Sequence, residues 1–342
     1  MSAPLQLRGW LPAAASVRDG QFGVDWLYFG EQALREPFFE DSVRYCLQRP
    51  FNQLFRRRTS MADLAEWQQQ QPGLEPSGFI FHLSRCGSTL LAQMLAAVPE
   101  HVVISEAQPI DAVLRAGETC PGLDDEQRAQ WLRWMISALG QPRRGERRLF
   151  LKLDSWHALD LPLIRRAFPE VPWIFLYRDP LEVLASQLAR RGAQTVAGLL
   201  SPALFGIDPA QGPLMPAHDY CAAVLAAISE AALRHCDGGA RLINYSQLPQ
   251  AATALVLPHF GVEPCAGQLE GMAAAARFDA KTPAQAFSRD PSKLARLTAV
   301  QRAAVEPRLG TSYRRLEATR LAQEGGATPG NGGSSLPAKQ AS

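Results

Sequence analysis

Four charged residues follow apolar runs of the sequence, and their types suit the binding of a phosphate-like anion beside a proton acceptor. Arg85, Lys152 and Arg178 supply cations, and Glu106 supplies a carboxylate that can take up a proton. Each residue lies at or just beyond an apolar run that predicts a buried strand. Because ligands of open parallel sheets bind outside the carboxyl ends of the strands, we expect these residues to share one site.

The first of these cations lies in a loop between a predicted strand and a predicted helix. Residues 79–83 suit a strand buried on both faces, and apolar residues recur at helical spacing over 90–95. Gly87 allows a sharp turn, and Ser88 or Thr89 opens the helix, whose unpaired N–H groups form an anion seat. A Walker A loop would carry a lysine here, and this sequence has none. For the loop alone, a tight connection with a solvated arginine remains an open alternative.

The elements that must position these residues are five apolar runs separated by helical patterns. The predicted strands are residues 79–83, 102–106, 149–154, 173–177 and 240–244. Strands that alternate with helices predict an α/β fold with a mostly parallel sheet covered on both faces.

Three segments are predicted along the chain. Residues 1–76 are rich in aromatic side chains, so we expect a helical and loop segment packed on the main domain. The main domain spans residues 77–320. Gly, Ser and Pro are frequent in residues 321–342, which predicts a disordered tail.

The composition limits the classes of function. A hydrophobic fraction of 46% and a charged fraction of 20% over 342 residues are ordinary globular values. The net charge of +2 is too small to indicate a nucleic-acid partner. The six cysteines and six histidines show no metal-ligand spacing, so we expect no metal and a cytoplasmic protein with reduced thiols. No run is long and apolar enough to predict a membrane partner.

Residues 178–186 form a second motif, in which Arg178 precedes Asp-Pro and Ser186 follows eight positions later. The planar fork of an arginine matches phosphate oxygens. This motif and the loop at 84–89 resemble the 3′-phosphate and 5′-phosphosulfate motifs of sulfotransferases that use 3′-phosphoadenosine 5′-phosphosulfate (PAPS). The resemblance in the cofactor and base region is closest to tyrosylprotein sulfotransferases, and it implies a P-loop-NTPase-like three-layer sandwich. An ordinary helix start with a surface serine is the alternative for residues 178–186.

The resemblance also implies roles for single residues. Glu106, 21 positions after Arg85, would be the general base. Lys152 and Arg85 would stabilise the charge that develops on the leaving 3′,5′-ADP. The expected cofactor-binding residues are Arg85, Cys86, Gly87, Ser88, Thr89, Leu90, Arg178, Ser186, Tyr245, Lys281 and Ser288. A helix-capping acid at 106 and a solvent-reaching lysine at 152 are the alternatives.

The sequence therefore predicts a PAPS-dependent sulfotransferase that acts on a hydroxyl or amine of a small-molecule or carbohydrate-like acceptor. Tyrosylprotein sulfotransferases hold acidic peptides with arginines where this chain has Gln108 and Ala112, which argues against an acidic tyrosine peptide. Two other functions stay open. One is a P-loop-type small-molecule kinase using ATP and magnesium, with Asp154 or Asp179 as metal ligand, and the other is a non-catalytic nucleotide-binding adaptor.

Overall fold

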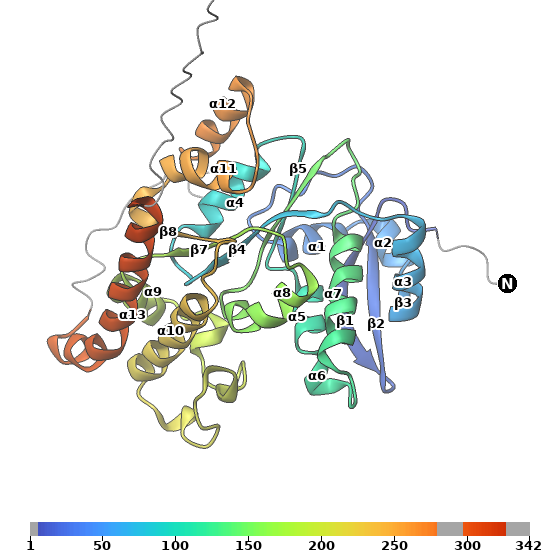
Figure 1. The fold of residues 1–342 in the computed structure, drawn as a ribbon. Coiled ribbons are helices and arrows are strands. Elements are labelled where there is room, and N and C mark those ends of the chain that lie inside the picture. The colour runs from blue at the N-terminus through green and yellow to red at the C-terminus, as the bar shows by residue number, and fades with distance from the viewer. Residues whose placement is uncertain (1–5, 279–296, 326–342) are drawn as a thin grey trace, which may run out of the picture.

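A five-stranded parallel sheet forms the centre of the computed structural model, which describes residues 6–278 and 297–325 (Figure 1). The strand order is β5-β6-β4-β7-β8, and every neighbouring pair is parallel. The strands are β4 (Pro76–His82), β5 (His101–Ser105), β6 (Arg148–Lys152), β7 (Trp173–Tyr177) and β8 (Ala240–Asn244). The predicted α/β fold and its five parallel strands are confirmed.

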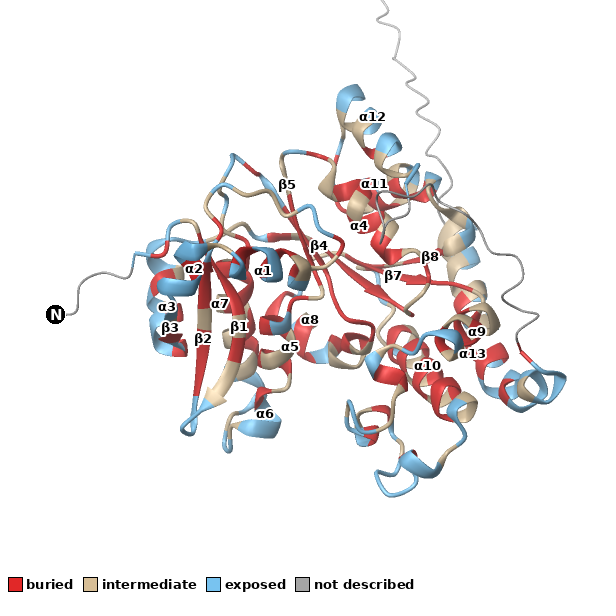
Figure 2. Cartoon of the chain, turned by 180° about the vertical axis from the view of Figure 1, so that it is seen from behind, coloured by how far each residue is buried: buried red, intermediate tan, exposed pale blue. Residues whose placement is uncertain are grey.

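The strands supply two separate cores because successive side chains of a strand point to opposite faces. Phe79 and Phe81 pack into one core, and Ile80 between them packs into the other. Both faces of the sheet are covered, so its strands are buried along most of their length (Figure 2). This explains why they are continuous apolar runs in the sequence.

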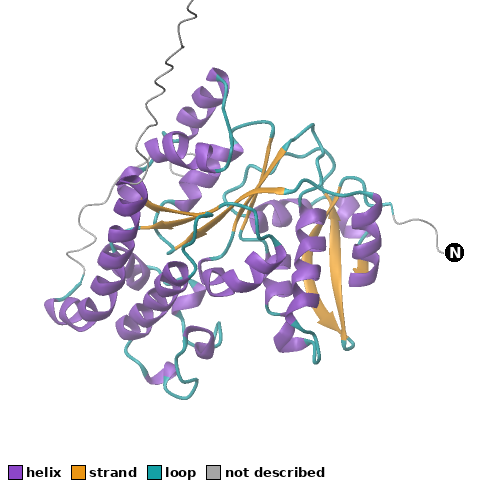
Figure 3. Ribbon diagram, viewed as in Figure 1, coloured by secondary structure: helices purple, strands orange, loops and turns teal. Residues whose placement is uncertain are grey.

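Helices cover both faces and produce the three-layer sandwich (Figure 3). The face of Ile80 is covered by α4 (Ser88–Ala96), the π-helical turn η6 (Ala252–Val256), α11 (Leu257–His259) and α12 (Ala266–Ala275). The other core takes in residues of α5 (Gln108–Leu114), α6 (Ala116–Thr119), α7 (Asp125–Leu139), α8 (Leu161–Ala167), α9 (Pro180–Ala189) and α10 (Ala217–Arg234). Short 3-10 turns are η1 (Ser155–Asp160), η2 (Ala193–Thr195), η3 (Pro202–Phe205), η4 (Gly212–Leu214) and η5 (Tyr245–Gln247).

The N-terminal segment contains a second, antiparallel sheet in the order β1-β2-β3, so the expectation of only helices and loops there is wrong. Its elements are β1 (Trp10–Arg18), β2 (Gln21–Tyr28), α1 (Phe39–Leu47), α2 (Pro50–Leu54), β3 (Arg57–Ser60) and α3 (Met61–Gln70). The small residues 13–15 and Gly23 weaken the apolar alternation of the strands. Asp19 and Gly20 form the hairpin turn with φ of 51° and 75°, and this Asp-Gly pair is a hairpin signal.

The N-terminal sheet is tied to the main domain close to the carboxyl end of β5. Ala15 of β1 donates its N–H to Gln108 Oε1 at 2.9 Å, and Gln108 Nε2 donates to the Ala15 carbonyl at 3.0 Å. The glutamine side chain therefore pairs with β1 as a further strand would. It opens α5, two positions after Glu106.

The C-terminal helix α13 (Ala299–Gly325) packs against α10 and lies along the edge strand β8 (Figure 1). It includes residues 321–325, which the sequence placed in a disordered tail. That expectation is wrong for these five residues because Gln323 and Glu324 bond to β8 and to the turn after it. Residues 326–342 lie outside the described residues. In the described part of the chain, no helix is long and apolar enough to cross a bilayer.

Candidate functional site

The structure brings Glu106 and Lys152 together at the carboxyl edge of the sheet. Ser105 of β5 lies opposite Lys152 of β6, so the residue after Ser105 meets the end of β6. Lys152 Nζ donates to Glu106 Oε1, and the Glu106 N–H donates to the Lys152 carbonyl at 2.7 Å. Glu106 has a left-handed φ of 54°, which turns the chain at this point from β5 toward α5.

The pair holds Glu106 in its ionised form. Burial alone would raise the pKa of this carboxyl, but Lys152 and then His82 outweigh it and hold the pKa of Glu106 well below its ordinary value. The Lys152 side chain is 0% exposed and that of Glu106 is 23% exposed. The carboxylate is therefore the counter-ion of a buried ammonium and still reaches solvent.

His82, the last residue of β4, is a third member of this group that the sequence analysis missed. Its Nε2 lies 3.3 Å from Glu106 Oε1, and its Nδ1 accepts the N–H of Ser84 at 3.0 Å. Burial and the nearby Lys152 lower the pKa of His82, so the ring is neutral with its proton on Nε2. The rule that placed Glu106 and Lys152 at strand ends would also have found this histidine.

The N-terminal segment reaches the same place through Phe38, which directly precedes α1. Lys152 Nζ lies 5.2 Å from the centroid of the Phe38 ring, within the range of a cation–π contact. The segment therefore contributes a side chain beside the proposed catalytic lysine. Nothing in the local sequence distinguishes Phe38 from the other aromatic residues of residues 1–76.

The loop after β4 has the backbone of an anion-binding turn. Ser84, Arg85 and Gly87 have left-handed φ values of 66°, 52° and 85°. Left-handed residues in a loop turn backbone N–H groups into concavities that suit anions. The helix α4 follows at once, with buried Ser88 and Thr89 and half-buried Leu90 in its first turn.

Gly87 is required for space as well as for conformation. A Cβ atom at this position would lie 2.8 Å from the ring of Tyr245 and 2.9 Å from Leu248 Cδ1. Tyr245 therefore packs directly on the loop, although it lies far from Gly87 in the sequence.

Two side chains fix the loop to its surroundings. Ser84 Oγ accepts from Gln187 Nε2 at 3.0 Å, and the buried Gln187 in turn accepts the N–H of Gly192 at 2.8 Å. Cys86 Sγ donates to the Leu176 carbonyl at 3.1 Å, and burial raises the pKa of Cys86 to about 11. Cys86 is therefore a protonated packing side chain, and any contact with an anion would come from its backbone N–H.

Arg85 and the second motif meet at α9. Arg85 Nη2 donates to the Arg190 carbonyl at 2.8 Å, just beyond the end of this helix. Ser186 lies half-buried within α9. Asp179 caps the helix by accepting the N–H groups of Leu181 at 2.9 Å and Glu182 at 3.2 Å, as a helix-start residue does.

Arg178 stands at the end of β7 and stacks on Tyr245. Its Cζ lies 4.4 Å from the centroid of the Tyr245 ring, and its Nη2 pairs with Glu182. Tyr245 thus contacts Arg178 of the second motif and packs on Gly87 of the first. The two motifs that the sequence treated separately are joined by one aromatic ring.

A cluster of titratable groups follows Lys152 in the chain. Burial raises the pKa of Asp154 to about 7, with Glu106 and Asp111 acting in the same direction and His157 against it. His157 Nε2 lies 2.8 Å from Asp111 Oδ1, which also accepts from Trp156 Nε1 at 2.8 Å. Among the described residues, no group of three or more His, Cys, Asp or Glu side chains is arranged to hold a metal ion.

The remaining predicted residues, Lys281 and Ser288, lie outside the described residues. The cofactor and base roles assigned to the other residues stay predictions, because the geometry gives their positions and contacts alone.

A comparison with models of protein families matches part of this chain. Residues 76–202, which include both motifs, match the model of a family described as the sulfotransferase family. A search of curated protein sequences found no significant match.

A search of solved structures aligned this chain with sulfotransferases and a sulfotransferase domain. Sulfotransferase STF9 from Mycobacterium avium is 14% identical, with 76% of this chain and 81% of that chain covered and a TM-score of 0.45. The sulfotransferase domain of the Synechococcus PCC 7002 olefin synthase is 16% identical, with coverages of 73% and 96% and a TM-score of 0.39. STF1 from Mycobacterium tuberculosis H37Rv is 16% identical, with coverages of 72% and 81% and a TM-score of 0.41.

Proposed function

We propose that this chain, whose residues 76–202 match the model of the sulfotransferase family, transfers a sulfuryl group from PAPS to a hydroxyl or amine acceptor. The observation that carries the proposal is the shared edge of the sheet. There the Glu106–Lys152 pair, the anion-binding loop and the Arg178–Tyr245 stack all follow the carboxyl ends of neighbouring strands.

The described residues fit the anionic groups of PAPS. The left-handed loop and the first turn of α4, residues 85–90, would hold the 5′-phosphosulfate. Arg178, with Ser186 on α9, would hold the 3′-phosphate. PAPS supplies the sulfuryl group and leaves as 3′,5′-ADP.

Glu106 is the proposed general base, and its pairing with Lys152 determines when it can act. An ionised carboxylate can accept a proton, but the adjacent ammonium keeps its basicity low. If Lys152 turned from Glu106 to an anionic group, the pKa of the carboxylate would rise and the base would become stronger. This exchange would couple donor binding to base activation.

The proposed transfer balances without a metal or a covalent enzyme intermediate. The acceptor oxygen or nitrogen forms a bond to sulfur while the bond from sulfur to the bridging oxygen breaks. The acceptor proton passes to Glu106, and Lys152 and Arg85 offset the charge that develops on the leaving group.

A small-molecule or carbohydrate-like acceptor in the cytoplasm completes the proposal. All six cysteines are free thiols, which supports a reducing compartment. Phe38 beside Lys152 gives the N-terminal segment a place next to the acceptor.

The test is transfer of radiolabel from PAPS to a panel of carbohydrates, phenols and amines. We expect a labelled product with at least one acceptor class, and a loss of about 10²-fold or more in turnover for Glu106→Gln with 3′,5′-ADP binding retained. The matched control is Glu170→Gln, an exposed residue after α8, which should behave as wild type. Normal turnover of the Glu106 variant would overturn its role as base.

A further inference from the structure

We infer that Glu317 of α13 is a positioning residue for the pair Arg178 and Tyr245, so that the C-terminal helix is part of the nucleotide site. The inference rests on the proposed function, because it assigns these two residues to the 3′-phosphate side of the donor. Glu317 would act through its neighbours and would not touch the nucleotide.

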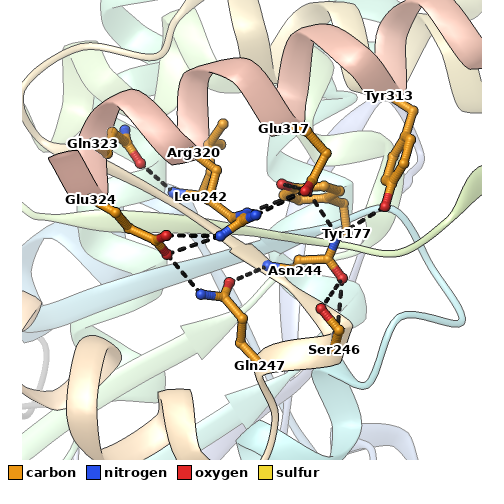
Figure 4. Close-up of polar contacts among 10 residues, drawn as sticks. All are labelled: Tyr177, Leu242, Asn244, Ser246, Gln247, Tyr313, Glu317, Arg320, Gln323 and Glu324. Carbon is orange, nitrogen blue, oxygen red and sulfur yellow. Dashed lines mark hydrogen bonds and ion pairs between the residues drawn. The ribbon is translucent and has the colours of Figure 1, made fainter.

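Glu317 binds the last residues of two adjacent strands (Figure 4). Its carboxylate accepts from the hydroxyl of Tyr177, which ends β7, and from Asn244 Nδ2 at 2.8 Å, which ends β8. Tyr177 and Asn244 are direct partners in the register of the parallel sheet. One carboxylate therefore fixes the relative position of two strand ends.

The residues that follow these strand ends are the proposed phosphate-side pair. Arg178 comes directly after Tyr177, and Tyr245 comes directly after Asn244. The stack of Arg178 on Tyr245 at 4.4 Å therefore depends on how the two strand ends lie relative to each other. Binding constellations need positions held to within about 0.5 Å, which one misplaced strand end would exceed.

Neighbouring residues of α13 contact β8 and the turn that holds Tyr245. Arg320 pairs with Glu317 at 2.8 Å and with Glu324 at 2.9 Å, and Glu324 accepts from Gln247 Nε2 at 2.8 Å. Gln323 accepts the Leu242 N–H at the edge of β8 (Figure 4). It also donates to the Ala240 carbonyl at 3.0 Å. Burial and the Glu317 carboxylate raise the pKa of Tyr177, which keeps its hydroxyl a donor.

The attachment of α13 does not depend on Glu317. The side chains of Val305, Leu309 and Leu316 are buried in the main core. Glu230 of α10 accepts from Ser312 Oγ at 2.9 Å and pairs with Arg315, away from the strand ends. Removal of the Glu317 carboxylate should therefore leave the helix in place and release the strand ends.

The experiment compares the affinities for 3′,5′-ADP and 5′-AMP, measured by calorimetry on the full chain. The dissociation constant of 5′-AMP divided by that of 3′,5′-ADP isolates the contribution of the 3′-phosphate to binding. We expect Glu317→Ala to reduce this ratio by about 10-fold, because the buried Tyr177 and Asn244 lose a hydrogen-bond partner, with 5′-AMP affinity within about 2-fold of wild type. If Glu317 had a purely structural role, its removal would weaken the binding of both ligands equally and leave the ratio unchanged. That result would overturn the inference.

Two further variants keep the test decisive. Glu230→Ala removes the contacts of α10 with Ser312 and Arg315 of α13, which do not involve the strand ends, and it should leave the ratio unchanged. Tyr177→Phe removes only the hydroxyl that donates to Glu317. If Glu317→Ala does not fold, this variant replaces it: a reduced ratio supports the inference, and an unchanged ratio overturns it. A wild-type ratio near unity would instead overturn the assignment of the 3′-phosphate site, and the inference with it.

Discussion

The Lys152 ammonium contacts the Glu106 carboxylate across 46 positions of the sequence, where β5 and β6 end. The ammonium side chain is completely buried, so the carboxylate is its counter-ion as well as the proposed base. Removal of one partner of such a pair leaves a buried charge uncompensated. The proposed catalysis and the stability therefore depend on the same contact, and the effects of a substitution on activity and on unfolding must be measured separately.

Glu106→Gln should lower the free energy of unfolding by about 2 kcal/mol at neutral pH. This is less than the loss from breaking a fully buried ion pair, because Glu106 reaches solvent. The depressed pKa of Glu106 stabilises the fold at pH values above the ordinary glutamate pKa of 4.5, and this contribution is lost as the pH falls toward the lower pKa of the folded state. Urea unfolding should therefore show a difference in the free energy of unfolding between wild type and Glu106→Gln at neutral pH, and this gap should narrow at about pH 3. A gap of the same size at both pH values would contradict the ion-pair explanation.

Gly87→Ala should weaken 3′,5′-ADP binding and lower stability by more than Gly145→Ala. Both glycines have a φ of 85°, but a Cβ at Gly145 meets nothing within 4 Å whereas one at Gly87 meets Tyr245. The Gly145 variant should cost about 1 kcal/mol, from the left-handed conformation alone. Thermal unfolding measures the loss of stability, and calorimetry measures the loss of 3′,5′-ADP affinity. Equal losses in the two variants would show that contact with Tyr245 is unimportant.

Arg178→Lys keeps the positive charge and removes the planar fork that stacks on Tyr245. We expect about 10-fold weaker binding of 3′,5′-ADP, with little change for 5′-AMP, because only the former carries the 3′-phosphate. Arg166→Lys, an exposed position on α8, serves as the control. Equally weakened binding of both nucleotides would show that Arg178 contacts a part of the ligand other than the 3′-phosphate.

Asp154→Asn should stabilise the protein increasingly as the pH rises from about 4 to about 7. Burial raises the pKa of Asp154 from 3.8 to about 7, so the folded state keeps a proton that the unfolded chain has released in this range. Wild type therefore loses stability with rising pH through this window, and the asparagine variant lacks that loss. Melting temperatures at both ends of the window test this, and a pH-independent difference would refute it.

The sequence analysis located the sheet edge because strands buried on both faces are continuous apolar runs. The same rule located Glu106 and Lys152, which need only be at adjacent strand ends to meet. It could not find Phe38 or Glu317, since their contacts come from packing of the N-terminal segment and of α13. Ala-rich β1 and Gly23 of β2 hid the N-terminal sheet, although the Asp19-Gly20 turn was a readable signal.

Calorimetry of 3′,5′-ADP binding, compared with ATP and magnesium, in wild type and Arg178→Ala, tests the central claim most directly. The proposed PAPS-dependent sulfotransferase predicts micromolar binding of 3′,5′-ADP that does not depend on magnesium and disappears in the variant. A preference for ATP with magnesium would contradict the claim and indicate a kinase. Binding of neither nucleotide would contradict it and indicate a non-catalytic adaptor.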